Sequence, residues 1–123
     1  MSHPNFILLY VASPAESSAF YTRLLGKPPV ENSPTFAMFA LDSGVMLGLW
    51  ASAGVEPAAT PAGGSELAFA VPDAAAVDAR FEAWKTSGMP ILQTPTAMDF
   101  GYTFTATDPD GHRLRVFSPA ARG

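Results

Sequence analysis

The stretch D-P-D-G-H-R-L-R-V-F, residues Asp108 to Phe117, combines a tight turn with a strand of alternating polar and apolar residues. A fainter copy, L-D-S-G-V-M-L-G-L-W, extends from Leu41 to Trp50. Each copy closes one half of the 123-residue chain. Two such copies in one chain indicate a duplicated architecture.

The elements before each turn repeat in the same order. In the first half we expect a strand at Phe6–Ala12, a helix between Ser13 and Gly26, and strands at Phe36–Leu41 and Val45–Ala51. In the second half we expect a strand at Glu66–Val71, a helix between Asp73 and Gly88, and strands at Ile91–Thr94, Tyr102–Thr107 and His112–Ser118. The sequence therefore predicts a single domain, residues 1–123. It contains two tandem βαβββ units, 5–51 and 66–119, joined by a linker rich in Ala, Gly and Pro at 52–65.

Composition excludes several classes of protein. With 48% hydrophobic and 15% charged residues, the chain is globular. A net charge of −4 with only seven Lys and Arg residues argues against a nucleic-acid surface. No apolar run has the length of a membrane span, and the N-terminus lacks a signal-peptide pattern, so we expect a cytoplasmic protein. The absence of cysteine excludes disulfides, thiol catalysis and Cys-based zinc sites.

Three motifs carry a resemblance to a known family. They are V-A-S-P-A-E-S-S-A-F-Y-T-R-L-L-G at 11–26, F-A-V-P-D at 69–73 and D-P-D-G-H-R-L-R-V at 108–116. Together they resemble the vicinal oxygen chelate superfamily, which includes glyoxalase I, extradiol dioxygenases and the fosfomycin- and bleomycin-resistance proteins. The resemblance covers nearly the whole chain. It implies an α+β fold in which the two units form a cup-shaped mixed sheet with the helices on its outer face.

The resemblance also implies where a metal ion would bind, because metal-using relatives take ligands from the first and last strands of each unit. In this chain those positions carry Phe6, Gly48, Glu66 and Arg115. A divalent ion needs about three or four oxygen or nitrogen donors, and arginine does not deprotonate to become one. A one-residue slip offers only Leu47 or Leu49, Leu67, and Leu114 or Val116. We therefore predict no metal site and no other cofactor.

No set of residues predicts catalysis. His3 lies near the terminus, where a solvated side chain is expected, and His112 follows the D-P-D-G turn. No Ser/His/Asp set has a motif around it, so no catalytic residue is predicted. The alternative is a lyase, isomerase or dioxygenase-type enzyme acting on a small metabolite. Glu66 could then be the base, although a neighbouring Arg115 would lower its pKa.

Glu66 and Arg115 are expected to face each other, because the first and last strands of one unit are neighbours in this fold. A carboxylate and a guanidinium can form a strong bidentate pair. Such a pair could simply neutralise two charges, or Arg115 could hold the carboxylate of an anionic ligand. The sequence leaves both roles open.

Strand alternation predicts an aromatic lining. Phe6, Leu8 and Tyr10 share a face with Met46, Gly48 and Trp50. Phe36, Met38 and, by repeat symmetry, Thr103 and Thr105 join this lining, with Tyr102 and Asp99 expected at its rim. Rings, methionines and hydroxyls suit a flat hydrophobic ligand, and Gly48 would leave room for one of its rings. The remaining aromatics expected in the core are Phe20, Phe39, Phe69, Phe81 and Trp84.

Within the superfamily, the chain most resembles the metal-free antibiotic-binding branch of bleomycin-resistance-like and phenazine-antibiotic resistance proteins. The motifs L-L-Y-V at 8–11, L-G-L-W at 47–50 and F-G-Y-T-F-T-A-T at 100–107 carry this resemblance. It implies stoichiometric sequestration of a planar or bulky drug, with Trp50 stacking and Arg115 and the threonines as polar anchors. It also implies a homodimer with the ligand at the subunit interface, since exposed strand edges need covering. A metabolite sensor or an accessory subunit remains an alternative, as does an ordinary aromatic metabolite as the ligand.

Overall fold

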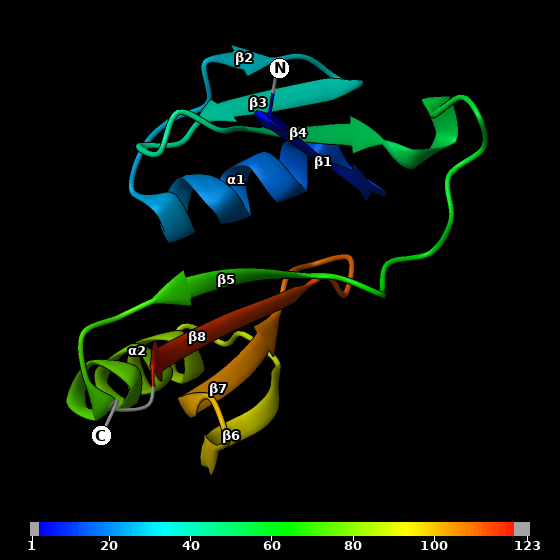
Figure 1. Ribbon diagram of the computed structural model, residues 1–123. Coiled ribbons are helices and arrows are strands. Elements are labelled where there is room, and N and C mark those ends of the chain that lie inside the picture. The colour runs from blue at the N-terminus through cyan, green and yellow to red at the C-terminus, as the bar shows by residue number, and fades with distance from the viewer. Residues whose placement is uncertain (1–2, 120–123) are drawn as a thin grey trace. The chain divides into compact units, whose positions relative to one another are not determined.

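The computed structural model describes residues 3–119 and is shown in Figure 1. The chain divides into two compact units between Ala62 and Gly63, inside the predicted linker. Each unit is a four-stranded mixed sheet with one helix, in the order βαβββ. The α+β fold class predicted from the sequence is therefore confirmed.

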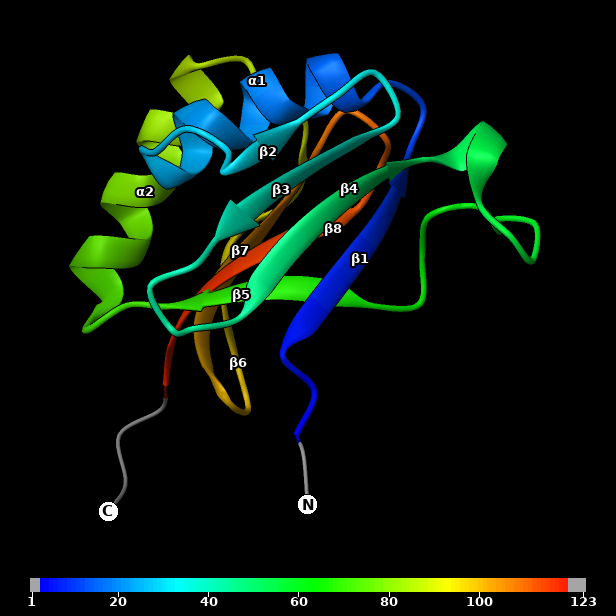
Figure 2. The same cartoon turned by 90° about the horizontal axis from the view of Figure 1, so that it is seen from above.

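The first unit contains β1 (Phe6–Val11), α1 (Pro14–Leu25), β2 (Glu31–Asn32), β3 (Phe36–Ala40) and β4 (Met46–Ala51), followed by a 3-10 turn, η1 (Ser52–Gly54). The strands lie in the order β1-β4-β3-β2, as Figure 2 shows. β1 is parallel to β4, and the other neighbours are antiparallel. After β1, helix α1 returns the chain to the end of the sheet at which β1 began, and this crossover allows β1 and β4 to be parallel.

Helix α1 begins where the sequence predicts. The Ser13 hydroxyl accepts a hydrogen bond from the Glu16 amide at 3.2 Å, and Gly26 ends the helix in the left-handed conformation with φ 73°. The helix covers one face of the sheet (Figure 1). The buried hydrophobic residues of this helix and sheet include Leu9, Val11, Tyr21, Ala37, Phe39, Leu47 and Leu49.

The second unit repeats this arrangement with β5 (Glu66–Ala70), α2 (Ala74–Thr86), β6 (Ile91–Met98), β7 (Gly101–Thr107) and β8 (Arg113–Pro119), in the order β5-β8-β7-β6. The Asp73 carboxylate caps α2 by accepting from the Ala76 amide at 2.8 Å. Trp84 packs edge-on against Phe69 and Phe104, with centroid distances of 5.8 and 5.3 Å. Of the helices within residues 3–119, none is long and apolar enough to cross a membrane.

The predicted core aromatics differ in burial. Phe39 and Trp84 are buried, whereas Phe20, Phe69 and Phe81 are half-buried. The half-buried rings still pack edge-on against other aromatics: Phe20 against Tyr21, Phe69 against Trp84 and Phe81 against Phe104. All five therefore belong to the helix–sheet packing of their units.

The two turns that mark the repeat share one backbone pattern. In the first, the Leu41 amide donates to the Val45 carbonyl at 2.9 Å and the Gly44 amide donates to the Leu41 carbonyl at 3.0 Å. In the second, Asp108, Gly111 and His112 make the same two bonds at 3.0 and 3.1 Å. Gly44 and Gly111 both have positive φ, 94° and 89°, which favours glycine at this point of the turn.

Two strands differ from the prediction. Residues Glu31–Asn32, for which no strand was predicted, form the short edge strand β2. β6 extends to Met98, beyond the predicted end at Thr94, although it contains Pro95. An edge strand tolerates proline because its outer side donates no ladder hydrogen bonds, and the register of β6 shifts twice between Ile91 and Thr96.

Candidate functional site

The sheet of the first unit has an aromatic face on the side opposite α1. Alternation places Phe6, Leu8, Tyr10, Phe36, Met38, Met46, Gly48 and Trp50 there, as predicted, and these residues define the aromatic face. Phe6 and Leu8 are 48% and 46% exposed, while Tyr10 and Trp50 are half-buried. The face therefore presents large apolar side chains to solvent.

Trp50 lies at the end of β4, just before η1. It pairs in register with Tyr10 on one side and Phe36 on the other. The Tyr10 and Trp50 rings meet edge to face, with centroids 6.4 Å apart and planes at 73°. This geometry orients both rings while leaving part of the Trp50 surface exposed.

Gly48 has a different role from the one predicted. A Cβ atom at this position would lie 2.7 Å from Leu8 Cδ2 and 2.9 Å from Phe36 Cζ. The space left by the absent side chain is thus filled by the protein's own Leu8 and Phe36. The glycine permits these two side chains to meet across β4, and it does not leave an empty place for a ligand ring.

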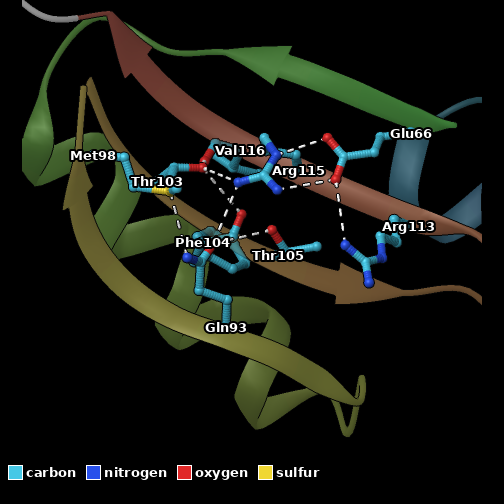
Figure 3. Close-up of polar contacts among 9 residues, drawn as sticks. All are labelled: Glu66, Gln93, Met98, Thr103, Phe104, Thr105, Arg113, Arg115 and Val116. Atoms are coloured by element: carbon cyan, nitrogen blue, oxygen red, sulfur yellow. Dashed lines mark hydrogen bonds and ion pairs between the residues drawn. The ribbon is translucent and has the colours of Figure 1, made fainter. Parts of the chain in front are cut away.

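The second unit has a polar face at the corresponding position, opposite α2. We define it by Glu66, Ala68, Gln93, Thr103, Thr105, Arg113, Arg115 and Phe117. Arg115 and Glu66 form the predicted bidentate ion pair, shown in Figure 3. Its Nε donates to Glu66 Oε1 at 2.8 Å, and its Nη2 donates to Oε2 at 2.9 Å.

The other terminal nitrogen of Arg115 extends the network. Nη1 donates to Thr103 Oγ1 at 3.2 Å and to Gln93 Oε1 at 3.3 Å. Thr103 in turn donates to the Val116 carbonyl at 2.8 Å, and Thr105 donates to Gln93 Oε1 at 3.4 Å. Thr103 and Thr105 are 0% and 2% exposed. Their buried hydroxyls therefore bond to Arg115 and Gln93 within the network and are not placed to contact a ligand at the surface.

The pair fixes the charge of Glu66. The hydrogen bonds from Arg115 lower the pKa of Glu66 below its ordinary value of 4.5, an effect that outweighs the opposing effect of burial. Attraction to the guanidinium of Arg113, whose Nη1 lies 4.0 Å from Glu66 Oε2, acts in the same direction. The same bonds raise the pKa of Arg115. A carboxylate held in its ionised form in this way is a poor base near neutral pH.

Three residues on or beside the polar face, Gln93, Phe100 and Phe117, were not predicted from the sequence. The Arg115 guanidinium lies 5.8 Å from the centroid of Phe100, whose ring meets Phe117 edge to face at 6.1 Å. Phe117 follows Arg115 by two residues, so alternation alone could have placed it. Gln93 and Phe100 lie in a bulged strand and a turn, where the sequence carries no equivalent signal.

Tyr102, which was predicted at the rim of the ligand-binding lining, points away from the polar face and toward α2. Its hydroxyl donates to Asp78 Oδ1 on α2 at 2.8 Å, and this bond raises the pKa of the phenol. The reason is alternation, because Tyr102 must point away from the face that its neighbour Thr103 occupies. Asp99 is exposed in the turn before β7, and His3 is exposed outside the sheets.

A metal ion does not fit the positions at which metal-using relatives carry ligands. The side chains of Phe6, Gly48 and Arg115 have no atom that can coordinate a metal ion. Both carboxylate oxygens of Glu66 already accept hydrogen bonds from Arg115. Across residues 3–119, no group of three or more His, Asp or Glu side chains converges in a way that could hold a metal ion.

The chain is similar to known proteins in sequence and in fold. Phenazine antibiotic resistance protein EhpR of Enterobacter agglomerans is 34% identical over 116 residues, which cover 92% of this chain and 89% of that protein. A protein of Agrobacterium tumefaciens with a solution NMR structure is 55% identical, covers 98% of this chain and 100% of its own, and superposes with a TM-score of 0.90. A glyoxalase-related enzyme of Fulvimarina pelagi shares the fold, with a TM-score of 0.82 at 22% identity over 96% of this chain and 88% of that one.

The family is shown by a match that spans both units. The sequence model of the Glyoxalase/Bleomycin resistance protein/Dioxygenase superfamily matches residues 3–116. The match therefore covers the first unit and nearly all of the second, including the turn at Asp108. The chain belongs to the glyoxalase/bleomycin resistance protein/dioxygenase superfamily and is similar to an antibiotic resistance protein.

Proposed function

We propose that this protein binds and sequesters a planar aromatic small molecule, a phenazine- or bleomycin-like antibiotic, without a metal ion or other cofactor. The observation that carries the proposal is the aromatic face, with Phe6 and Leu8 about half exposed beside the Trp50 and Tyr10 rings. Exposed apolar surface of this kind marks binding sites more often than ordinary protein surface. The similarity to EhpR supports the ligand class.

Stacking is the interaction that this face supplies best. Trp50 is held edge-on by Tyr10, so one of its surfaces can receive a flat ring at little cost in side-chain entropy. The methionines Met38 and Met46 adapt to the outline of a ring system because their side chains are unbranched. We therefore assign Trp50 as the principal stacking residue.

Sequestration is favoured over turnover by the state of Glu66. An enzyme of this fold without a metal would need a general base, and Glu66 is the carboxylate that the sequence offers for that role. Its bonds to Arg115 keep it ionised but lower its pKa, which weakens it as a base. Glu66 is consequently poorly suited to abstracting a proton near neutral pH.

The role of Arg115 is narrower than the sequence predicts. Nε and Nη2 of Arg115 already donate to Glu66, so a ligand carboxylate would have to displace Glu66 to form the same bidentate pair. We propose that Arg115 organises the polar face instead of serving as the main anion anchor.

We propose that the protein acts as a cytoplasmic homodimer with the ligand site at the subunit interface. The proposal rests on the resemblance and on the edges of β1 and β5, each of which lies at the end of its sheet with one side unpaired in that sheet. Sedimentation equilibrium should give twice the chain mass. A single-chain mass at micromolar concentration, with and without ligand, would contradict the dimer.

Two tryptophans make the binding proposal directly testable, because Trp84 is buried and Trp50 is not. The variant Trp84→Phe keeps Trp50 as the only tryptophan. Titration of this variant with phenazine should quench its fluorescence to saturation in EDTA, with no change on adding Mn²⁺, Zn²⁺ or Ni²⁺. In Trp50→Ala, calorimetry should show affinity about tenfold weaker, the loss expected for one aromatic contact.

Trp84→Phe is also the control for general disruption, because it changes a tryptophan of the second unit without touching the aromatic face. Chromatography of the recovered ligand should show it unchanged. Binding that requires added metal, conversion of the ligand, or wild-type affinity in Trp50→Ala would each overturn the proposal.

A further inference from the structure

The indole nitrogen of Trp50 is a hydrogen-bond donor that is open to solvent. Within residues 3–119, no atom accepts a hydrogen bond from its N–H group. Trp50 is half-buried, and in this part of the chain no fully buried side-chain nitrogen or oxygen of a buried or half-buried residue lacks a partner. The Trp50 nitrogen is therefore not fully buried, and its N–H group can donate to an acceptor from outside the protein.

Open space lies next to that nitrogen, at Gly54 in η1. Apart from atoms of its own turn, a Cβ atom at Gly54 would come within 4.0 Å of one heavy atom, Trp50 Nε1. Gly54 has no positive φ, so the backbone of η1 does not require glycine at this position. In contrast to Gly48, over which Leu8 and Phe36 meet, Gly54 leaves room beside an aromatic ring of the first unit.

The donor lies at the edge of the ring that we assign to stacking. Tyr10 meets Trp50 edge to face and fixes its orientation. An indole N–H bond lies in the plane of the ring, so it points away from the ring edge and not toward a ligand stacked on either surface. An acceptor for this donor must therefore be carried on a side arm that extends beyond the stacked ring of the ligand.

We propose that the Trp50 N–H group donates a hydrogen bond to a carbonyl-type oxygen on a side arm of the ligand, and that Gly54 leaves the space for this side arm. The inference rests on the proposed function and narrows its ligand class. The ligands are planar aromatics that carry a ketone, amide or carboxylate group on the ring, in preference to those with an apolar substituent. Trp50 and Gly54, both in the first unit, are then specificity-determining residues.

The test uses three ligands: phenazine-1-carboxamide, 1-isopropylphenazine and unsubstituted phenazine. The first two have side arms of the same branching, but only the carboxamide carries an oxygen acceptor. Affinities are measured by equilibrium dialysis, with the ligand detected by its absorbance, so that the measurement does not depend on tryptophan fluorescence.

Three variants separate the donor from the space beside it. Trp50→Phe keeps a ring for stacking but has no N–H group. Gly54→Val keeps the donor and fills the space, and Ala53→Val is its control because it adds bulk at the neighbouring exposed position of η1. Thermal unfolding of each variant verifies that it is folded, and the ratio of two affinities is taken within one protein.

Wild type should bind the carboxamide about fivefold more tightly than 1-isopropylphenazine, the ratio expected for one net hydrogen bond. In Trp50→Phe all affinities should fall, and this ratio should approach one. Gly54→Val should weaken binding of both substituted compounds by about tenfold through crowding, while its affinity for phenazine stays unchanged. Ala53→Val should bind all three ligands as wild type does.

Two results in the variants would overturn the inference. They are a preference for the carboxamide that persists in Trp50→Phe, and wild-type binding of the substituted compounds by Gly54→Val. If wild type binds phenazine but shows no preference for the carboxamide, the inference fails and the proposed function stands. If wild type binds none of the three ligands, both fail.

Discussion

Gly48 and Arg115 occupy equivalent positions in the two units. Gly48 pairs with Leu8 on the first strand of its unit and with Met38 on the third, and Arg115 pairs with Ala68 and Thr105 in the same way. Around Gly48 the neighbours are apolar, and Leu8 and Phe36 fill the space above it. Arg115 instead donates hydrogen bonds to the polar side chains of Glu66, Thr103 and Gln93.

The comparison separates what maintains the fold from what varies. Both units keep an apolar core against the helix and the same backbone pattern in the turn before the last strand. Their opposite faces differ almost completely in chemistry. Because the helix-covered face supplies most of the buried apolar surface, the other face is free to carry function.

The strongest way to break this difference is to give the first unit the arginine of the second. Gly48→Arg should lower the free energy of unfolding by about 3 kcal/mol, because its Cβ would displace Leu8 and Phe36 and its charge would lack a carboxylate. Adding Phe6→Glu, at the position equivalent to Glu66, should recover about 1 kcal/mol. Urea denaturation measures both.

Gly48→Ala separates the steric part of that loss from the electrostatic part. It should cost less than about 1 kcal/mol, because the atoms that must move are the ends of side chains. If Gly48→Arg costs no more than Gly48→Ala, charge is tolerated on the aromatic face, and the contrast between the two faces is not energetic.

A second difference lies in the turns. Asp108 Oδ1 accepts from the Asp110 and His112 amides, each at 2.9 Å, whereas the equivalent residue of the first turn is Leu41, which has no such acceptor. Asp108→Ala should therefore destabilise the protein by about 2 kcal/mol in urea denaturation, since two charge-assisted bonds are lost. Asp108→Asn keeps one oxygen acceptor and should recover about half. Equal stability of the Ala variant and wild type would mean that the backbone alone holds both turns.

Sequence reasoning succeeds in this fold where the signal is local. Ser13, Asp73 and Gly26 mark helix ends because capping involves residues three or four positions apart. Alternation likewise predicts the whole aromatic face, and the Glu66–Arg115 pair follows once the two strands are known to be neighbours. Alternation also indicates that Tyr102 and Thr103 lie on opposite faces of β7.

The unpredicted parts depend on irregular or non-local geometry. Gln93 reaches Arg115 through a strand whose register shifts around Pro95, and Phe100 lies in a turn. The contact of Leu8 and Phe36 over Gly48 is also invisible in the sequence, because it depends on side-chain directions from two neighbouring strands. Contacts of this kind leave no periodic signal in the sequence.

A third prediction measures how tightly the polar face is coupled. In a double-mutant cycle with Glu66→Gln and Arg115→Met, the coupling energy should be about 1 kcal/mol. This lies at the upper end of the range for surface pairs, because the Glu66 and Arg115 side chains are only 30% and 18% exposed. Thermal or urea unfolding of the four proteins gives the value. A coupling indistinguishable from zero would show that the network is held by Thr103 and Gln93 instead.

The smallest effect concerns pH, and only the polar face should show it. The pKa of Glu66 lies below 4.5 in the folded protein, so in acid the unfolded chain binds the proton first. The pair's contribution is present above pH 4.5 and is lost as the pH falls through the lower, folded pKa. Wild type should exceed Glu66→Gln in unfolding free energy by less than about 1 kcal/mol at pH 7, and the difference should vanish in acid. Because the other carboxylates titrate in both proteins, the difference between them isolates Glu66. Arg115→Met should lose the Glu66 contribution to the pH dependence in the same way, since it removes the hydrogen bonds that lower the pKa of Glu66. If that variant keeps the pH dependence of the wild type, the pKa shift is due to Arg113.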